Sequence, residues 1–366
     1  MRVLVAMSGG VDSSVAAALL AGAGHDVVGA TMKLWGGPSD SGCCSVADVE
    51  DARRVAQQLG IVHHVFNFSQ DFAAQVVEPY VTAHARGLTP NPCVECNRHI
   101  KFHRFLDRAT RLGFDAVATG HHARVERSDA GRWRLLRGRD GAKDQSYVLS
   151  MLGQAQLARS RFPVGELTKA AVRERAAAIG LCTAAKPDSQ DVCFITSGRP
   201  PGGGGGRRGG LLAGPASDAG GGRAGFLAGR LALHPGRLVQ AGTAEVVGTV
   251  PAVELVTVGQ RRGLGTGADG RRRYALSIDV ATSTVEVGGE GDLLAGRVRL
   301  SSLTWVDRAV PPGTEVLAQA SAHGMALPAV FEGRGLAWAR PERRIAPGQT
   351  VALYDGDAVL GAGLVG

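Results

Sequence analysis

The chain has 366 residues, 44% of them hydrophobic, and a formal net charge of +8 at pH 7. This length accommodates two or three domains of roughly 150 residues each, and the apolar content excludes a wholly disordered chain. No apolar run reaches the roughly 18 residues of a membrane helix, and the first residues predict a strand rather than a signal peptide. We therefore expect a cytoplasmic protein without a membrane partner, whose mild positive charge suits a polyanion.

The first 197 residues predict strands that alternate with helices. Regular alternation of this kind is typical of a parallel sheet with helices on both faces. Residues 1–197 are therefore expected to form an α/β nucleotide-binding catalytic domain. The expected strands are residues 2–6, 26–32, 61–66 and 116–119, and the expected helices are residues 15–23, 48–59 and 105–112.

The pattern changes after residue 197. Residues 198–224 contain 12 glycines, and such a stretch cannot bury enough apolar surface to offset its ordering entropy. We interpret it as a flexible insertion. The remaining sequence has short β-branched runs separated by Gly and Pro, without helical spacing. It predicts a small central β-rich domain at residues 225–292 and a C-terminal β-barrel at residues 293–366.

A loop that suits phosphate binding lies between the first strand and the first helix. Backbone N–H groups and the helix dipole hold anions at such a place, and adjacent glycines allow close approach. The loop lacks the Gly-Lys-Ser/Thr end of a Walker A loop and the third glycine of the dinucleotide fingerprint. It resembles the pyrophosphate loop of enzymes that split ATP into AMP and pyrophosphate, although an ordinary strand-to-helix turn is an alternative. Its sequence is Ser8-Gly9-Gly10-Val11-Asp12-Ser13.

The chain contains six cysteines. In a long chain without an export signal, cysteines serve chemistry or metal binding more often than a disulfide framework. We expect Cys93 and Cys96 in a polar loop ahead of the helix at residues 105–112. A zinc site is disfavoured, because adjacent cysteines lack the usual ligand spacing. The six are Cys43, Cys44, Cys93, Cys96, Cys182 and Cys193.

Five further stretches have a recognisable sequence and order. They are TPNPCVECN at residues 89–97, ATGHHAR at 118–124, KDQSY at 143–147, KPDSQDVCFI at 186–195 and GQRRGL at 259–264. Together with the loop, they closely resemble the bacterial tRNA-specific 2-thiouridylase family, over nearly the whole chain except the insertion. The resemblance implies an ATP-dependent sulfurtransferase that replaces the 2-oxygen of the wobble uridine of tRNA with sulfur.

The resemblance also implies a division of labour among residues. Cys193 would carry a persulfide, and Cys96 would be its partner nucleophile. The implied nucleotide site comprises Ala6, Met7, Ser8, Gly9, Gly10, Val11, Asp12, Ser13, Met32 and Gly120. The implied tRNA contacts are Asn91, Pro92, Cys93, His121, Lys143, Asp144, Gln145 and Gln349.

Cofactors and partners follow from the same resemblance. ATP with Mg²⁺ is expected, and Asp12 is the candidate Mg²⁺ ligand. Cys93 stands where many family members have Asp, so Cys93, Cys96 and Cys193 offer three thiolates that could hold an iron–sulfur cluster instead of a persulfide relay. The expected partners are tRNA and a sulfur-donor protein, either a cysteine desulfurase or a relay carrier. Two alternatives stay open: another adenylating ATP-pyrophosphatase, and a non-catalytic tRNA-binding relative.

Overall fold

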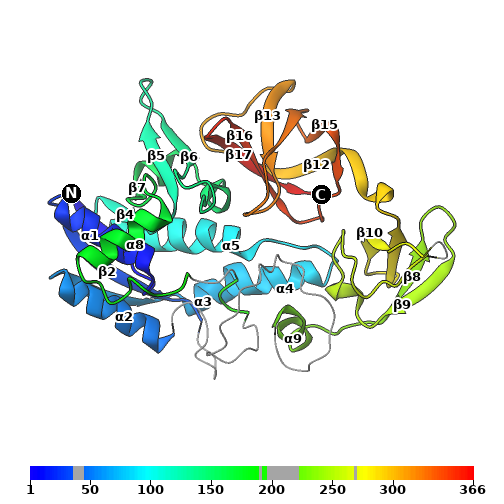
Figure 1. The fold of residues 1–366 in the computed structure, drawn as a ribbon, viewed down its shortest axis with the longest axis horizontal. Coiled ribbons are helices and arrows are strands. Elements are labelled where there is room, and N and C mark those ends of the chain that lie inside the picture. Colours follow the sequence, from blue (N-terminus) through cyan, green and yellow to red (C-terminus); the bar gives the residue numbers. More distant parts are fainter. Residues whose placement is uncertain (36–44, 189–191, 196–221, 268–269) are drawn as a thin grey trace.

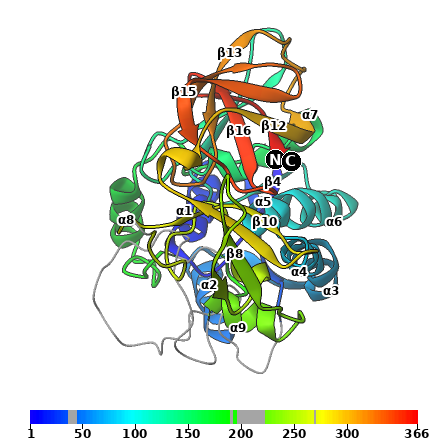
Figure 2. The same cartoon turned by 90° about the vertical axis from the view of Figure 1, so that its right-hand side faces the viewer.

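The computed structural model describes residues 1–35, 45–188, 192–195, 222–267 and 270–366. They form an α/β domain, a small central β domain and a β-barrel, which confirms the predicted fold class (Figure 1). The barrel lies above the α/β domain in this view and in the perpendicular one (Figure 2). Within the described part of the chain, no helix combines the length and apolar character needed to cross a bilayer.

The α/β domain is built on a five-stranded sheet in the order β3-β2-β1-β4-β7. All neighbouring strands are parallel. Successive side chains of a strand point to opposite faces, so Leu4 of β1 enters one core while Val3 and Val5 enter another. The strands are β1 (Arg2–Ala6), β2 (Asp26–Lys33), β3 (Val62–Asn67), β4 (Ala116–Ala118) and β7 (Ser160–Arg161).

Helices cover both faces of this sheet. The Val3 side packs against α1 (Val11–Gly22), α2 (Val46–Gln58) and α8 (Lys169–Ala178). The Leu4 side packs against a second group of helices, which includes the segment that carries Cys96, and Cys193 packs against the same core. That group comprises α3 (Ser69–Phe72), the π-helical stretch Ala73–Val77, α4 (Glu78–His84), α5 (Pro92–Glu95), the π-helical stretch Cys96–Phe105, α6 (Leu106–Arg111) and α7 (Gln154–Ala158).

The helix that carries Cys96 begins much earlier than expected. It starts at Pro92 in α5 and continues through the π-helical stretch Cys96–Phe105 into α6. The expectation that Cys93 and Cys96 lie in a loop is therefore wrong. A π-helix has five-residue hydrogen-bond spacing, so its apolar residues do not follow the 3.6-residue period by which an α-helix is found in a sequence.

The central domain contains α9 (Gly222–Ala228) and a four-stranded sheet in the order β10-β11-β8-β9. Its core includes Leu238, Val253, Leu264 and Val285. Residues 196–221, which hold most of the expected flexible insertion, lie outside the described residues. The strands are β8 (Gly236–Gln240), β9 (Val246–Val250), β10 (Tyr274–Asp279) and β11 (Thr284–Gly288).

The C-terminal strands close into a barrel, because β12 pairs with β15 on one side and with β17 on the other. The barrel's sheet extends into the α/β domain. Strand β17 also pairs with β6 through Ala358 and Leu136, and β6 pairs with β5. The strands are β5 (Ala123–Arg127), β6 (Trp133–Arg137), β12 (Leu294–Trp305), β13 (Thr314–Gln319), β14 (Leu327–Phe331), β15 (Gly335–Arg343), β16 (Thr350–Asp355) and β17 (Ala358–Val365).

Buried polar contacts hold the barrel against the α/β domain. The Arg137 guanidinium lies 3.8 Å from the ring centroid of Tyr354 and donates to Asp144 and Gln319. The hydroxyl of the fully buried Tyr147 donates to the carbonyl of Thr350 at 2.9 Å. Arg137 and Tyr147 of the α/β domain thus each have a polar or aromatic partner in the barrel. The α/β domain and the barrel are therefore one packed body.

Candidate active site

The loop at residues 8–13 joins the end of β1 to the start of α1. Gly10 is the N-cap of α1, and no side chain caps this end of the helix. The first backbone N–H groups of a helix have no partner within the helix, and with the helix dipole they favour an anion. The hydroxyls of Ser13 and Ser14 both donate to the Gly10 carbonyl, at 3.0 and 2.8 Å, and fix the turn.

Two glycines allow neighbouring segments of the chain to pack closely against this loop. Gly9 has a φ of +71°, and a Cβ there would lie 2.2 Å from the carbonyl oxygen of Asp48. A Cβ on Gly120 would lie 2.5 Å from the backbone nitrogen of Ser13. Both distances are far below ordinary contact, so a larger residue at either position would displace the loop. The loop and the end of β4 are thus packed directly against each other.

Asp12, the acidic residue of the loop, is held by two cationic or polar side chains. The ammonium of Lys169 lies 2.8 and 2.6 Å from the two carboxylate oxygens, and His122 Nε2 lies 3.1 Å from Oδ1. Burial by itself would raise the pKa of Asp12, but the hydrogen bonds from His122 and Lys169 outweigh it and lower that pKa. Asp12 is therefore a carboxylate with its charge compensated by Lys169.

The position of Asp12 bears on the expected Mg²⁺ site. A carboxylate ligand must offer an oxygen lone pair to the ion. Both oxygens of Asp12, however, bond to the Lys169 ammonium. The Lys169 side chain is only 12% exposed. An ammonium at this distance would repel a divalent cation. The arrangement does not fit Mg²⁺ at Asp12.

Lys169 was not identified from the sequence, although a local signal exists. It follows Thr168, the N-cap of α8, and therefore occupies the first position of a helix. A positive side chain is unfavourable there because the helix N-terminus is itself positive. A lysine at such a position suggests an anionic partner elsewhere in the fold, and that partner proves to be Asp12.

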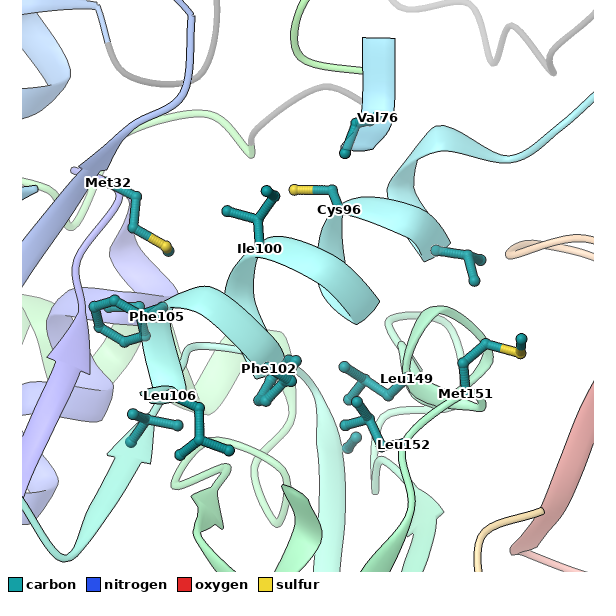
Figure 3. Packing of buried hydrophobic residues seen from close by; sticks show 14 of the residues in the cluster. Met32, Val76, Cys96, Ile100, Phe102, Phe105, Leu106, Leu149, Met151 and Leu152 are labelled. Carbon is teal, nitrogen blue, oxygen red and sulfur yellow. The ribbon is translucent and has the colours of Figure 1, made fainter. Parts of the chain in front are cut away.

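The candidate nucleophiles lie on the face of the sheet opposite α1. Cys96 is 8% exposed and lies among buried hydrophobic residues such as Val76 and Ile100 (Figure 3). Met32, the expected adenine contact, belongs to the same cluster and is also 8% exposed. The half-buried Cys193 packs against this cluster as well. The structure thus brings both cysteines and Met32 to one core.

The segment that carries Cys193 is anchored by aromatic packing. Phe194 is 5% exposed, and its ring centroid lies 5.1 Å from that of Phe226 and 5.6 Å from those of Phe72 and Tyr80. Aromatic pairs at such distances and steep angles are favourable beyond their buried area. Phe226 belongs to α9, so the start of the central domain helps to hold the Cys193 segment.

Asn91 and Cys93 lie at the start of the helix that carries Cys96, which is called the cysteine helix here and runs from Pro92 into α6. The Asn91 side chain accepts from the backbone N–H groups of Cys93 and Val94, at 3.0 and 3.4 Å, and so caps α5. Cys93 is half-buried and Pro92 is buried. Within the described residues, no three His, Cys, Asp or Glu side chains are grouped to hold a metal. The cysteines Cys43 and Cys44 lie outside those residues.

The five expected tRNA contacts outside the Asn91–Cys93 turn differ in exposure. Lys143 and Gln145 are exposed, so both can reach a large ligand, although each also bonds to a protein group. The side chains of the other three are engaged in contacts within the protein. His121 is 7% exposed and bonds to Thr119, the Asp144 side chain is 5% exposed and bonds to Arg137, and Gln349 donates to the Thr89 carbonyl at 2.6 Å.

His121 illustrates how neighbouring residues can differ. Burial lowers the pKa of His121 well below its ordinary value, which favours the neutral form of the ring. The next residue, His122, contacts Asp12 of the loop. Sequence reasoning singled out His121 and omitted His122, because the two adjacent histidines carry no local signal that separates them.

A parallel sheet whose first strand feeds a glycine- and serine-rich loop at a helix N-terminus defines a nucleotide-binding enzyme domain. Three family models match the chain in sequence: the tRNA methyl transferase HUP domain over residues 1–197, the tRNA methyl transferase PRC-barrel domain over residues 224–289, and the aminomethyltransferase beta-barrel domain over residues 297–365. Together with the relatives below, these matches show that the chain belongs to the tRNA-specific 2-thiouridylase family.

Curated relatives match over their whole length. The chain is 47% identical over 374 residues to the tRNA-specific 2-thiouridylase MnmA of Chloroflexus aggregans, covering 100% of this chain and 98% of that protein. It is 44% identical over 391 residues to the protein of the same name from a Roseiflexus species, covering 100% and 99%.

A solved structure gives a much weaker match. The U34-tRNA thiolase NcsA from Methanococcus maripaludis, with its 4Fe-4S cluster, is 17% identical at a TM-score of 0.34, over 50% of this chain and 57% of that one. A likeness at this level transfers neither a ligand nor a residue role.

Proposed function

We propose that this chain catalyses the ATP-dependent 2-thiolation of the wobble uridine of tRNA, a cytoplasmic reaction that releases AMP and pyrophosphate. The observation that carries the proposal is the pairing of an anion-binding loop with two cysteines packed on one core. The loop suits cleavage of ATP, and the cysteines suit sulfur transfer. Relatives of 44–47% identity over the full chain bear the name of this activity.

In the first step, the 2-oxygen of uridine attacks the α-phosphorus of ATP and pyrophosphate leaves. We assign the pyrophosphate to the first N–H groups of α1 and to the Lys169 ammonium beside them. The Lys169 side chain is only 12% exposed, so solvent screens its ammonium weakly. Because Gly120 has no side chain, the chain after β4 can lie against the first turn of α1. Met32 with the Ala6 backbone would face the adenine.

In the second step, a persulfide on Cys193 attacks carbon 2 of the activated base, and AMP leaves with the former oxygen. The base is then joined to Cys193 through a disulfide. The Cys96 thiolate attacks the Cys193 sulfur, which forms a Cys96–Cys193 disulfide and releases 2-thiouridine. A thiol reductant then restores both cysteines. The relay needs no cluster, and a cysteine desulfurase or a relay carrier would supply the persulfide.

The base must leave its stack to reach these groups, as other base-modifying enzymes require. We assign its contacts to the first turn of α5, where the Asn91 cap fixes Pro92 and Cys93. Exposed Lys143 and Gln145 would contact the RNA backbone. His121, Asp144 and Gln349 would act by holding the surrounding protein, because their side chains are buried or already bonded to it.

The test is a reconstituted reaction. The purified chain would be mixed with a tRNA transcript, ATP and a persulfide-loaded cysteine desulfurase, and the digested nucleosides would be analysed by mass spectrometry. We expect 2-thiouridine and AMP in equal amounts, and neither without ATP. AMP without thiouridine would favour another adenylating ATP-pyrophosphatase. Binding of tRNA with no AMP would favour a non-catalytic relative.

A further inference from the structure

Asp188 gathers three cationic side chains around one carboxylate. Its Oδ2 lies 2.7 Å from the ammonium of Lys143, and its Oδ1 lies 2.9 Å from both the ammonium of Lys169 and the guanidinium of Arg173. Burial by itself would raise the pKa of Asp188, but hydrogen bonds from Lys143 and Lys169 hold that pKa far below its ordinary value. Asp188 therefore remains ionised throughout the physiological pH range.

The three cations come from different parts of the site. Lys169 also bonds to Asp12 of the phosphate loop. Lys143 belongs to the exposed stretch that the proposed function assigns to RNA contact. Arg173 donates to the carbonyls of Ala184 and Lys186, so it fixes the backbone that leads to Asp188. One carboxylate thus links the phosphate loop, the RNA-contact stretch and the backbone that leads toward the Cys193 segment.

The Lys169 ammonium illustrates what this link does. Its side chain is 12% exposed and bonds to two carboxylates, Asp12 and Asp188. A flexible lysine held by a single partner can change rotamer, whereas two partners restrict the ammonium to one place. A fixed charge stabilises a developing anion without reorganisation at the moment of reaction.

We propose that Asp188 is a positioning residue, which sets the Lys169 ammonium at the phosphate loop and the Lys143 ammonium beside it. This proposal rests on the proposed function for its substrates. Asp188 does not touch the reacting atoms. It acts through Lys169 on the nucleotide and through Lys143 on the RNA.

The direction in which ATP affinity changes distinguishes a positioning role of Asp188 from a purely electrostatic effect of its charge. Asp188→Asn removes a negative charge from a site that binds anions, so a field effect alone would tighten the binding of ATP and tRNA. A positioning role predicts the opposite, because Lys169 loses its second carboxylate partner and Lys143 loses its bond to Asp188. We expect the Kd for ATP to rise about tenfold in Asp188→Asn, with a similar direction for tRNA.

Lys186, which also holds the segment before Asp188 in place, provides the control. Lys186 bonds to Asp48 and Asp51 of α2, at 2.7 and 2.6 Å, and contacts neither Asp12 nor Asp188 in the structure. Lys186→Met therefore loosens the segment without releasing Lys169. We expect its Kd for ATP to stay within about twofold of the original chain. Asp188→Glu keeps the charge on a longer arm and should recover most of the affinity.

The experiment is a double-mutant cycle on the full chain. ATP binding would be measured by calorimetry for Asp188→Asn, Lys169→Met and the combined variant, and tRNA binding by filter retention for the matching cycle with Lys143→Met. We expect Asp188→Asn to have less than about a twofold further effect in the Lys169→Met background. Thermal melting checks that each variant is folded.

Three results would overturn the inference. They are tighter or unchanged ATP binding in Asp188→Asn, equal weakening in Lys186→Met, and a full additional loss in the combined variant. The proposed function fails separately, if the original chain forms no 2-thiouridine in the reconstituted reaction. The ATP cycle requires no thiolation, so it reports on Asp188 in either case.

Discussion

Gly120 and Ser13 lie closer together than any side chain at position 120 would permit. A Cβ on Gly120 would come 2.5 Å from the Ser13 backbone nitrogen and 2.6 Å from the carbonyl carbon of Asp12. The chain after β4 therefore presses directly on the first turn of α1, the place where we expect the phosphates of ATP. The geometry of the nucleotide site depends on this absence of a side chain.

The first prediction follows from that contact. Gly120→Ala must push the loop away, because the nearest atoms are backbone and cannot rotate aside. Overpacking of this kind costs about 1–3 kcal/mol, so we expect ATP affinity to fall about tenfold or more. Calorimetry with ATP would measure it. Gly141→Ala is the matched control, because a Cβ there meets nothing within 4 Å. Normal ATP affinity in Gly120→Ala would contradict the assignment of the loop.

The second prediction concerns the cysteines. Cys96→Ser and Cys193→Ser should each lower thiolation more than about a thousandfold, since each removes a nucleophile that the proposed relay requires. Both variants should bind ATP normally, because serine is close to cysteine in size and neither cysteine is assigned a contact with the nucleotide. Cys182→Ser serves as the control, since Cys182 is exposed and lies outside the shared core. Full thiolation by either of the first two variants would rule out the relay.

The third prediction concerns His84 and pH. Burial, with a smaller effect of the Arg223 charge, lowers the pKa of His84 from 6.5 to about 4. Between these values the unfolded chain binds a proton that the folded chain does not, so the stability is present above pH 6.5 and is lost as the pH falls toward 4. This difference alone makes the free energy of unfolding about 2 kcal/mol lower at pH 5 than at pH 7.

Urea unfolding at the two pH values would measure this loss. The ring of His84 is 2% exposed and lies edge-on to Tyr80, so His84→Phe keeps the packing and removes the titration. We expect the change between pH 7 and pH 5 to be about 2 kcal/mol smaller in this variant. His103→Phe, at an exposed position, is the control. An unchanged difference in His84→Phe would show that another group is responsible.

The fourth prediction concerns the contact between the α/β domain and the barrel. Arg137→Met would remove the contacts with Gln319 and Tyr354 of the barrel, and it would leave the carboxylate of Asp144, which is 5% exposed, without its cationic partner. Breaking a buried pair in this way costs about 3 kcal/mol, so the urea midpoint should fall clearly. Arg134→Met on the same strand removes an exposed pair with Glu126 and should cost less than about 1 kcal/mol. Equal losses in the two variants would mean that Arg137 does not hold the interface.

The sequence predicted the parallel sheet and the phosphate loop because both leave local signals. Apolar strands such as residues 2–6 alternate with helices, and the loop's glycines and serines are contiguous. The start of the cysteine helix also had a local sequence signal, but the spacing of the apolar residues after it did not indicate an α-helix. Asn91 followed by Pro92 is an N-cap followed by a proline at the first helical position, but the π-helical stretch after it hid the helix.

Other features left no local signal. The hairpin β5–β6 is completed by a strand more than 200 residues away in the sequence, since Leu136 pairs with Ala358. Likewise, Lys169 and Asp188 meet the loop and the RNA-contact stretch only through the fold. Which of His121 and His122 contacts Asp12 of the loop depends on how β4 ends, and spacing alone does not determine that.

The pairing of β6 with β17 has a consequence for dividing this enzyme. A fragment that stops before β12 would keep the β5–β6 hairpin but lose the strand that covers its edge. It would also expose Tyr147, whose hydroxyl needs the Thr350 carbonyl. Uncovered strand edges and exposed aromatic side chains favour aggregation. A minimal catalytic fragment should therefore retain the barrel. A barrel from another protein could be joined to residues 1–197 only if the contact residues of both the α/β domain and the barrel were changed together.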